Sequence, residues 1–154
     1  MGGNIQKIEI LNRKASYEYE ILDRYTAGIV LSGSEIKSIR ENGCSISEAF
    51  CTFRQSELWV RNMNVPIYDK AVFTNHQPDS VRKLLLRKKE LHRVETKVKE
   101  RGISVIPLRI FSSDRGFLKM EIGLCRGKKS FDKRESIKQK ENKRDIDRVM
   151  KIYK

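Results

Sequence analysis

The residues best suited to chemistry lie where the last apolar stretch of the chain runs into Gly127-Lys128-Lys129. A glycine lets the backbone approach a phosphate group closely, and the two ammonium groups beside it supply positive charge. The same residues would also suit a strand that ends in a run of solvated charges, and spacing alone does not separate these readings. The chemistry that this motif favours is non-covalent binding of phosphate.

A single aromatic residue, Phe131, follows within the cationic run Lys129-Ser130-Phe131-Asp132-Lys133-Arg134. An aromatic ring flanked by cations can stack on a nucleic-acid base while its neighbours pair with phosphates. The alternative is a phenylalanine that folds back onto the body of the protein as an anchor. Both readings place Phe131 in a segment rich in positive charge.

Residues 126–154 contain 12 Lys+Arg and 5 Asp+Glu, so they carry +7 of the chain's net charge of +13. A segment so charged buries too little apolar surface to offset the entropy of ordering it. Residues 137–153 can form a helix, but apolar residues line up only in its last turns, at Ile146, Val149, Met150 and Tyr153. We therefore predict a body of residues 1–127 and a basic tail of residues 128–154 that stays disordered until it binds. Its simplest partner is RNA.

Catalytic and metal-binding residue patterns are absent from the sequence. Glu90 and Glu95 are not spaced as a helical pair, and Glu35 stands alone, so all three are expected to be solvated charges. The two histidines, His76 and His92, are poor material for a zinc site. We predict neither enzymatic activity nor a cofactor.

Three cysteines, Cys44, Cys51 and Cys125, have no metal-ligand spacing and are expected to be buried reduced thiols. The N-terminus has no long apolar stretch, and no segment approaches the length of a membrane span. These features predict a cytoplasmic protein.

Apolar patterning predicts several short strands and two helices. The predicted strands are residues 17–22, 26–31, 49–54, 57–62, 103–111 and 117–124, with 83–86 a strand or a helix entry. A helix over residues 34–40 is expected to begin at a Ser34 cap and end at Gly43, and a clearer one covers residues 88–101. Gln55-Ser56 is not a favoured two-residue turn, so that hairpin loop is expected to be longer. Residues 64–79 are predicted to form a long surface loop.

These elements favour a mainly β fold, a small closed OB-like antiparallel barrel with helices on its rim and the basic tail outside it. A ferredoxin-like layer is the structural alternative. Small barrels of this kind bind nucleic acid on their outer faces and loops.

Several collinear motifs resemble the SmpB family, the SsrA (tmRNA) binding proteins of bacteria. They are Asn12-Arg13-Lys14-Ala15, Ala27-Gly28-Ile29-Val30-Leu31, Gly33-Ser34-Glu35-Ile36-Lys37-Ser38-Ile39-Arg40, Arg82-Lys83-Leu84-Leu85-Leu86, Gly127-Lys128-Lys129 and Asp132-Lys133-Arg134-Glu135. The resemblance runs from about Asn12 to Lys151. It implies an OB-like barrel and a role in trans-translation, in which tmRNA rescues ribosomes stalled on messages that lack a stop codon.

The resemblance also implies partners and site residues. The partners are tmRNA, the stalled ribosome with its small-subunit RNA and, indirectly through tmRNA, elongation factor Tu and alanyl-tRNA synthetase. The expected tmRNA contacts are Thr26, Glu35, Lys37, Arg40, Leu85, Lys119, Lys128 and Lys129. The residues expected in the decoding centre and message channel are Phe131, Lys133, Arg134, Lys138, Val149 and Met150. Thr26 is a departure, because the family commonly has glutamate there, and Arg24 or Tyr25 would have to compensate.

Two other functions are consistent with a basic chain of this size. A ribosomal protein or general RNA chaperone would bind RNA without preference for tmRNA. An RNA-acting enzyme such as a nuclease would need a carboxylate cluster that the sequence lacks.

Overall fold

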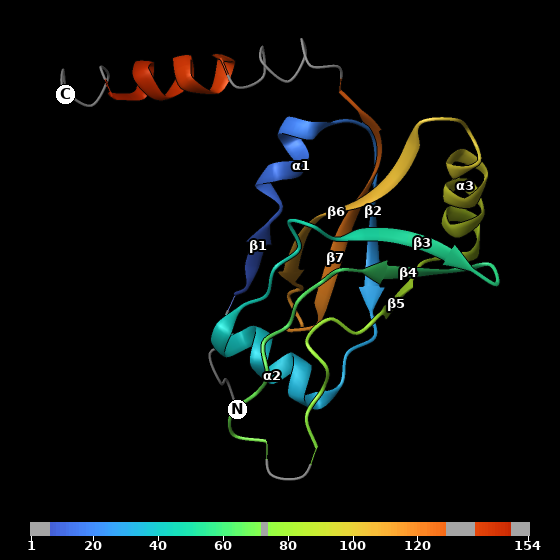
Figure 1. The fold of residues 1–154 in the computed structure, drawn as a ribbon, viewed down its shortest axis with the longest axis vertical. Helices are drawn as coiled ribbons and strands as arrows, with labels where there is room; N and C mark the ends of the chain where they lie inside the picture. Colours follow the sequence, from blue (N-terminus) through green and yellow to red (C-terminus); the bar gives the residue numbers. More distant parts are fainter. Residues whose placement is uncertain (1–6, 72–73, 129–137, 149–154) are drawn as a thin grey trace.

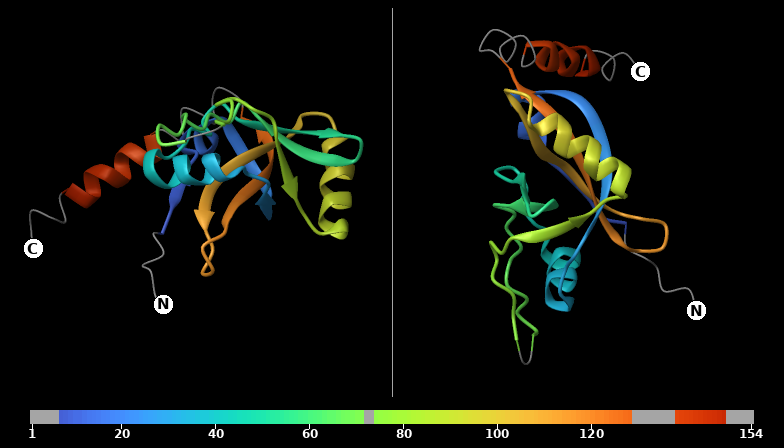
Figure 2. Two further views of the ribbon diagram at one scale, coloured as in Figure 1. Left: turned by 90° about the horizontal axis from the view of Figure 1, so that it is seen from below. Right: turned by 90° about the vertical axis from the view of Figure 1, so that its right-hand side faces the viewer.

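The computed structural model describes residues 7–71, 74–128 and 138–148 of the 154-residue chain. Its described part is mainly antiparallel β-structure with helices around the sheet (Figure 1, Figure 2). The strands are β1 (Glu9–Leu11), β2 (Tyr19–Ile29), β3 (Phe50–Arg54), β4 (Glu57–Arg61), β5 (Arg82–Leu85), β6 (Ile103–Ser112) and β7 (Leu118–Gly127). The helices are α1 (Arg13–Glu18), α2 (Gly33–Asn42), α3 (Lys88–Val98) and a further helix over residues 138–148.

The strands pair into a closed ring. Their order is β1-β6-β3-β4-β5-β2-β7, and an additional pairing of β6 with β7 closes the circuit. All the pairings are antiparallel, and β1 pairs with residues 109–111, near the C-terminal end of β6. The predicted antiparallel fold with helices at its edges is confirmed.

Strand β2 is one continuous strand of 11 residues, where the sequence pattern predicts two. It pairs with β7 from Tyr19 opposite Gly127 to Gly28 opposite Lys119, with a bulge between Ile21 and Asp23. The bulge absorbs one extra residue without ending the pairing. Pairing with β7 along its whole length therefore overrides the local tendency of Asp23 and Gly28 to break a strand.

The first helix and first strand were not predicted. Asn12 caps α1 by accepting a hydrogen bond from the Ala15 amide, 3.2 Å away, and its side-chain amide donates to the carbonyls of Ile46 and Pro107. Ala15 then packs on the outer side of β6 and β7 in a small core of its own. This second core explains why both faces of the sheet are buried there.

Two further boundaries differ from the prediction. Gln55 and Ser56 form a two-residue turn between β3 and β4 with positive φ values of 51° and 62°, the geometry of a tight hairpin. Helix α3 ends at Val98 rather than near Arg101. In the main core, α2 contributes Ile39 and α3 contributes Val94, both at most 2% exposed.

Candidate nucleic-acid interface

The candidate interface begins on the outer face of β2, around Gly28. Gly28 is opposite Leu85 of β5 on one side and opposite Lys119 of β7 on the other. Paired residues point to the same side of a sheet, and the neighbours Ala27 and Met120 are fully buried. Leu85 and Lys119 therefore face outward together, and Leu85 is 51% exposed.

Thr26 lies on the same face, two residues before Gly28, and is exposed. Gly28 carries no side chain, and a Cβ placed there would be in van der Waals contact with Leu85, 3.4 Å from the Leu85 Cβ. The structure thus brings together three predicted tmRNA contacts, Thr26, Leu85 and Lys119, from three strands. We call this surface the β2 face.

A charge network lies at the edge of the β2 face. Glu121, the cross-strand partner of Thr26, accepts hydrogen bonds from Arg24 at 2.8 Å and from Arg109 at 2.9 Å. Partial burial would raise the pKa of Glu121, but the hydrogen bonds and charges of Arg109 and Arg24 hold it below its ordinary value. The carboxylate stays ionised, and the two arginines are oriented on the outer face; sequence reasoning had missed Arg109.

Glu35, an expected tmRNA contact, has a buried side chain and does not lie on the outer surface. Helix α2 is capped by Ser32 and begins at Gly33, so the prediction that Ser34 caps it is wrong. Ser32 and Glu35 form a reciprocal capping box, and Glu35 is only 7% exposed. Its carboxylate also pairs with Arg82, so this residue serves the interior of the protein.

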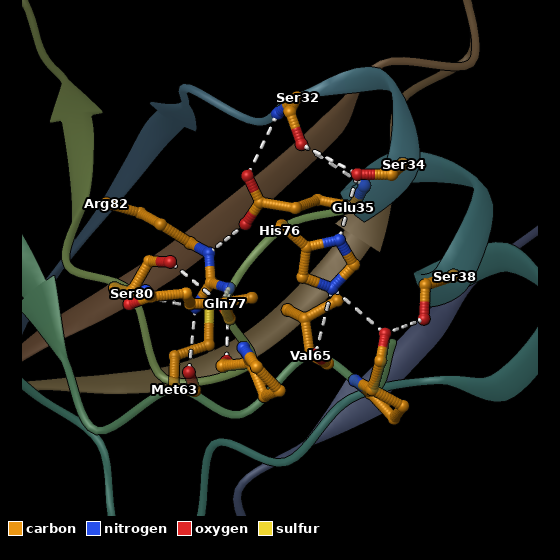
Figure 3. Close-up of polar contacts among 12 residues, drawn as sticks. Ser32, Ser34, Glu35, Ser38, Met63, Val65, His76, Gln77, Ser80 and Arg82 are labelled. Atoms are coloured by element: carbon orange, nitrogen blue, oxygen red, sulfur yellow. Dashed lines mark hydrogen bonds and ion pairs between the residues drawn. The ribbon is translucent and has the colours of Figure 1, made fainter. Parts of the chain in front are cut away.

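Arg82 is a buried hub, 3% exposed, at the start of β5. Besides its ion pair with Glu35, its guanidinium donates to four backbone carbonyls (Figure 3). The acceptors are Met63 at 2.7 Å, Ser80 at 3.0 Å, Pro78 at 3.1 Å and Gln77 at 3.3 Å. Because the five N–H groups of arginine form a fixed fork, one side chain holds α2, the end of β4 and the following loop in one arrangement.

Burial would raise the pKa of Glu35, but the Ser32 backbone amide and then the hydrogen bond and charge of Arg82 lower it below its ordinary value. The pair is therefore ionised, and neither charge is left alone in the interior.

His76 makes a second link between α2 and the loop (Figure 3). Its Nε2 lies 3.0 Å from the Val65 carbonyl and 2.9 Å from the Pro66 carbonyl, while its Nδ1 lies 2.9 Å from the Ser34 hydroxyl. Since carbonyls only accept, we assign the proton to Nε2, and Nδ1 of the neutral ring then accepts from Ser34. Ser38 also donates to the Pro66 carbonyl, so the loop is fixed along the first half of α2.

The other predicted contacts on α2 are exposed. Lys37 places its ammonium 5.9 Å from the centre of the Tyr68 ring. Arg40 donates from Nη2 to the Gly116 carbonyl in the β6–β7 turn at 3.0 Å. Both side chains lie at the α2 end of β2, beyond the β2 face.

The remaining predicted residues belong to the tail. The Lys128 amide donates to the Glu18 carbonyl at 2.9 Å and its ammonium to the Ser16 carbonyl at 3.0 Å, so the start of the tail is fixed to α1. Lys138 is exposed on the helix of residues 138–148. The predicted contacts that lie outside the described residues are Lys129, Phe131, Lys133, Arg134, Val149 and Met150.

No group of three or more potential metal ligands occurs in the part of the chain that the structure describes. The three cysteines are free. Burial raises the pKa of Cys44 and of Cys125 to about 11 and that of Cys51 further, so their thiols are protonated at neutral pH. Among the described residues, no helix is long and apolar enough to cross a membrane.

A closed antiparallel ring with basic residues on its outer face and helices at its ends defines a class of small nucleic-acid-binding β-proteins. Comparison with known proteins narrows the class. The family described as "SmpB protein" matches residues 9–152. The chain therefore belongs to the SmpB family.

Curated relatives agree over nearly the full chain. The SsrA-binding protein of Cytophaga hutchinsonii is 54% identical over 94% of this chain and 95% of the relative. Those of Christiangramia forsetii and Thermosipho africanus are 53% and 43% identical, over 96% and 94% of this chain and 94% and 97% of theirs. A chain of the solved structure described as "tmRNA-SmpB: a journey to the center of the bacterial ribosome" is 40% identical and superimposes with a TM-score of 0.68, covering 84% of this chain and 94% of that one.

Proposed function

We propose that this protein binds the tRNA-like domain of tmRNA through the β2 face and delivers it to stalled ribosomes. The observation that carries the proposal is the convergence of Thr26, Leu85 and Lys119 around Gly28, which three strands bring together. The names of the relatives, SsrA-binding proteins, and the tmRNA and ribosome in the description of the solved structure support it. The role is one of binding and mimicry, without chemistry of its own.

On the β2 face each residue type has a physical part. Lys119 supplies a point charge for a phosphate, and exposed Leu85 gives an apolar surface that shapes the fit to RNA. Arg24 and Arg109, held by Glu121, extend the positive charge beside Thr26. They offer phosphate contacts at the position where the family commonly has glutamate.

The tail is proposed to act on the ribosome. Its residues Phe131, Lys133, Arg134, Lys138, Val149 and Met150 would lie in the decoding centre and the empty message channel, with Phe131 stacking on a base. Within it, residues 138–148 are helical, and their charged side chains are almost all exposed, which suits a channel walled by RNA. Elongation factor Tu and alanyl-tRNA synthetase would be reached through tmRNA, in the cytoplasm.

Co-purification and affinity test the proposal directly. Full-length protein recovered from its host should carry tmRNA. Lys119→Gln should weaken tmRNA binding, whereas Lys99→Gln, at the exposed residue that follows α3, should not. Recovery of ribosomal RNA alone, with equal affinity of both variants for tmRNA and for an unrelated RNA, would instead favour a ribosomal protein or a general RNA chaperone.

A further inference from the structure

A second feature of the surface lies outside the β2 face: an aromatic side chain, Tyr68, with two lysines beside α2. Tyr68, Lys37 and Lys70 line a cavity of about 340 Å³ together with Gly33 and Ser34 at the start of the helix. We name this cavity the α2 groove. It lies between a helix and a loop that are tied together by the Arg82 hub and by His76.

The backbone of Tyr68 is held in place by the loop around it. The Asn75 side chain accepts from the Tyr68 amide at 3.2 Å and donates to the Tyr68 carbonyl at 2.8 Å. The next residue, His76, is fixed to Ser34 and to the carbonyls of Val65 and Pro66. The backbone at Tyr68 is therefore pre-organised, and only its side-chain torsions remain to be ordered when a ligand contacts it.

The charges around Tyr68 suit an anion. Lys37 has no ion-pair partner among the described residues, and its ammonium is 5.9 Å from the Tyr68 ring centre. Lys70 is paired with Glu41 at 3.3 Å, with its side chain 72% exposed, so the pair is screened and easily exchanged for a phosphate. The groove thus combines a ring for stacking with one unpaired and one weakly paired cation.

We propose that the α2 groove binds one nucleotide of tmRNA, with its base stacked on Tyr68 and its phosphate at Lys37 and Lys70. The inference rests on the proposed function, because it assumes that tmRNA is the ligand of the β2 face. Stacking on one aromatic side chain with phosphate pairing beside it is a common way to bind an unpaired nucleotide.

The position of the groove selects tmRNA rather than ribosomal RNA. Strand β2 leads from the tail exit, where Tyr19 is opposite Gly127, to the β2 face, where Gly28 is opposite Lys119. Helix α2 begins a few residues later, at the end of the ring away from the tail (Figure 1). The groove therefore lies beyond the Gly28 end of β2, whereas Gly127, where the tail begins, lies at the opposite end of the strand.

The role of Arg82, Glu35 and His76 follows from this arrangement. They contact no nucleotide and act as positioning residues, because they set the distance between Lys37 on the helix and Tyr68 on the loop. This assigns Glu35 an indirect part in RNA binding, in place of the direct contact that the sequence suggested.

The test compares Tyr68→Leu, which removes the ring but keeps an apolar side chain, with Tyr68→Phe, which keeps the ring. In titrations of full-length protein with tmRNA we expect Tyr68→Leu to lose about 5- to 100-fold in affinity, and Tyr68→Phe to stay within about twofold of wild type. Wild-type affinity of Tyr68→Leu would overturn the proposal.

A measurement on the unmodified protein decides the matter if Tyr68→Leu fails to fold. Acetylation of lysines in the presence and absence of tmRNA should show Lys37 and Lys70 protected by the RNA, with Lys99 labelled equally in both. Equal labelling of all three would overturn the groove. Lys119→Gln distinguishes the α2 groove proposal from the proposed function of the β2 face. If Lys119→Gln weakens tmRNA binding and Tyr68→Leu does not, only the proposal for the α2 groove is wrong.

Discussion

Leu85 and Lys119 are register partners of the same residue, Gly28, from opposite edges of β2. They are 34 positions apart in the sequence, and they are neighbours on one surface because β2 lies between β5 and β7. Because a glycine separates them, no side chain stands between the apolar and the cationic member of the pair. This surface is where we expect RNA affinity to be most sensitive to substitution.

The first prediction concerns that surface. Leu85→Asp should weaken tmRNA binding, because it adds a negative charge beside Lys119, and should change the free energy of unfolding by no more than about 0.5 kcal/mol at so exposed a site. Lys119→Gln should lower the slope of log affinity against log salt by about one unit. Titrations at several salt concentrations measure both effects. An unchanged slope would mean that Lys119 meets no phosphate.

The second prediction concerns the Arg82 hub. Arg82→Met should lower the free energy of unfolding by about 3–5 kcal/mol, because it leaves the buried Glu35 carboxylate unpaired. Arg82→Lys keeps the charge but cannot reach several carbonyls at once, so it should lie between wild type and Arg82→Met. Urea unfolding measures the series. The double variant Arg82→Met with Glu35→Gln is the control, and it should recover part of the loss.

The third prediction is a pH dependence of stability with a defined sign. The pKa of Glu35 is lowered in the folded protein, so the unfolded chain takes up the proton first as the pH falls. The stabilisation is therefore complete above its ordinary value of 4.5 and is lost as the pH falls through the folded pKa. Thermal unfolding between pH 7 and pH 3 should show this loss in wild type and a smaller loss in Glu35→Gln. If stability falls equally with pH in both proteins, Glu35 is not the group responsible. Glu121 is then the next candidate, because its pKa is lowered too.

The fourth prediction separates body from tail. A chain that ends at Gly127 keeps the whole of β7 and the β2 face, so its tmRNA affinity should stay within a few-fold of wild type. It lacks the residues proposed for the message channel, so peptide tagging on stalled ribosomes should be abolished. Binding and tagging assays on the same preparation give the answer. A parallel loss of both would contradict the division of labour.

Local patterns predicted the elements that local chemistry determines. The β3–β4 hairpin, the apolar stripe of α3 and the Gly43 end of α2 were all evident, and Gly43 has the expected positive φ of 74°. The six-residue α1 was missed because its signal is a single cap, Asn12, with no apolar stripe after it. The capping residue Asn12, three residues before Ala15, was the sequence signal that could have found it.

What the sequence did not predict depends on distant partners. Strand β2 is continuous because it pairs with β7, about a hundred residues away in the sequence. His76 was expected to be a loop histidine, and Arg82 was noted only within a family motif, since nothing local indicates that six carbonyls and one carboxylate surround these two side chains. Tyr68 gave no signal either, because its setting requires the loop to fold back onto α2. The resemblance to SmpB predicted the position of the β2 face but not what supports it.

The β2–β7 pairing also fixes a length. Between Tyr19 and Gly28 the strand advances about 30 Å at ~3.3 Å per residue, from the exit of the tail to the face and groove proposed for tmRNA. Strand β7 pairs with this span on both sides of the bulge between Ile21 and Asp23. The two strands therefore keep Gly127, where the tail begins, at a set spacing from the β2 face. Deleting two residues from both strands would keep the facing of every side chain and shorten only that spacing.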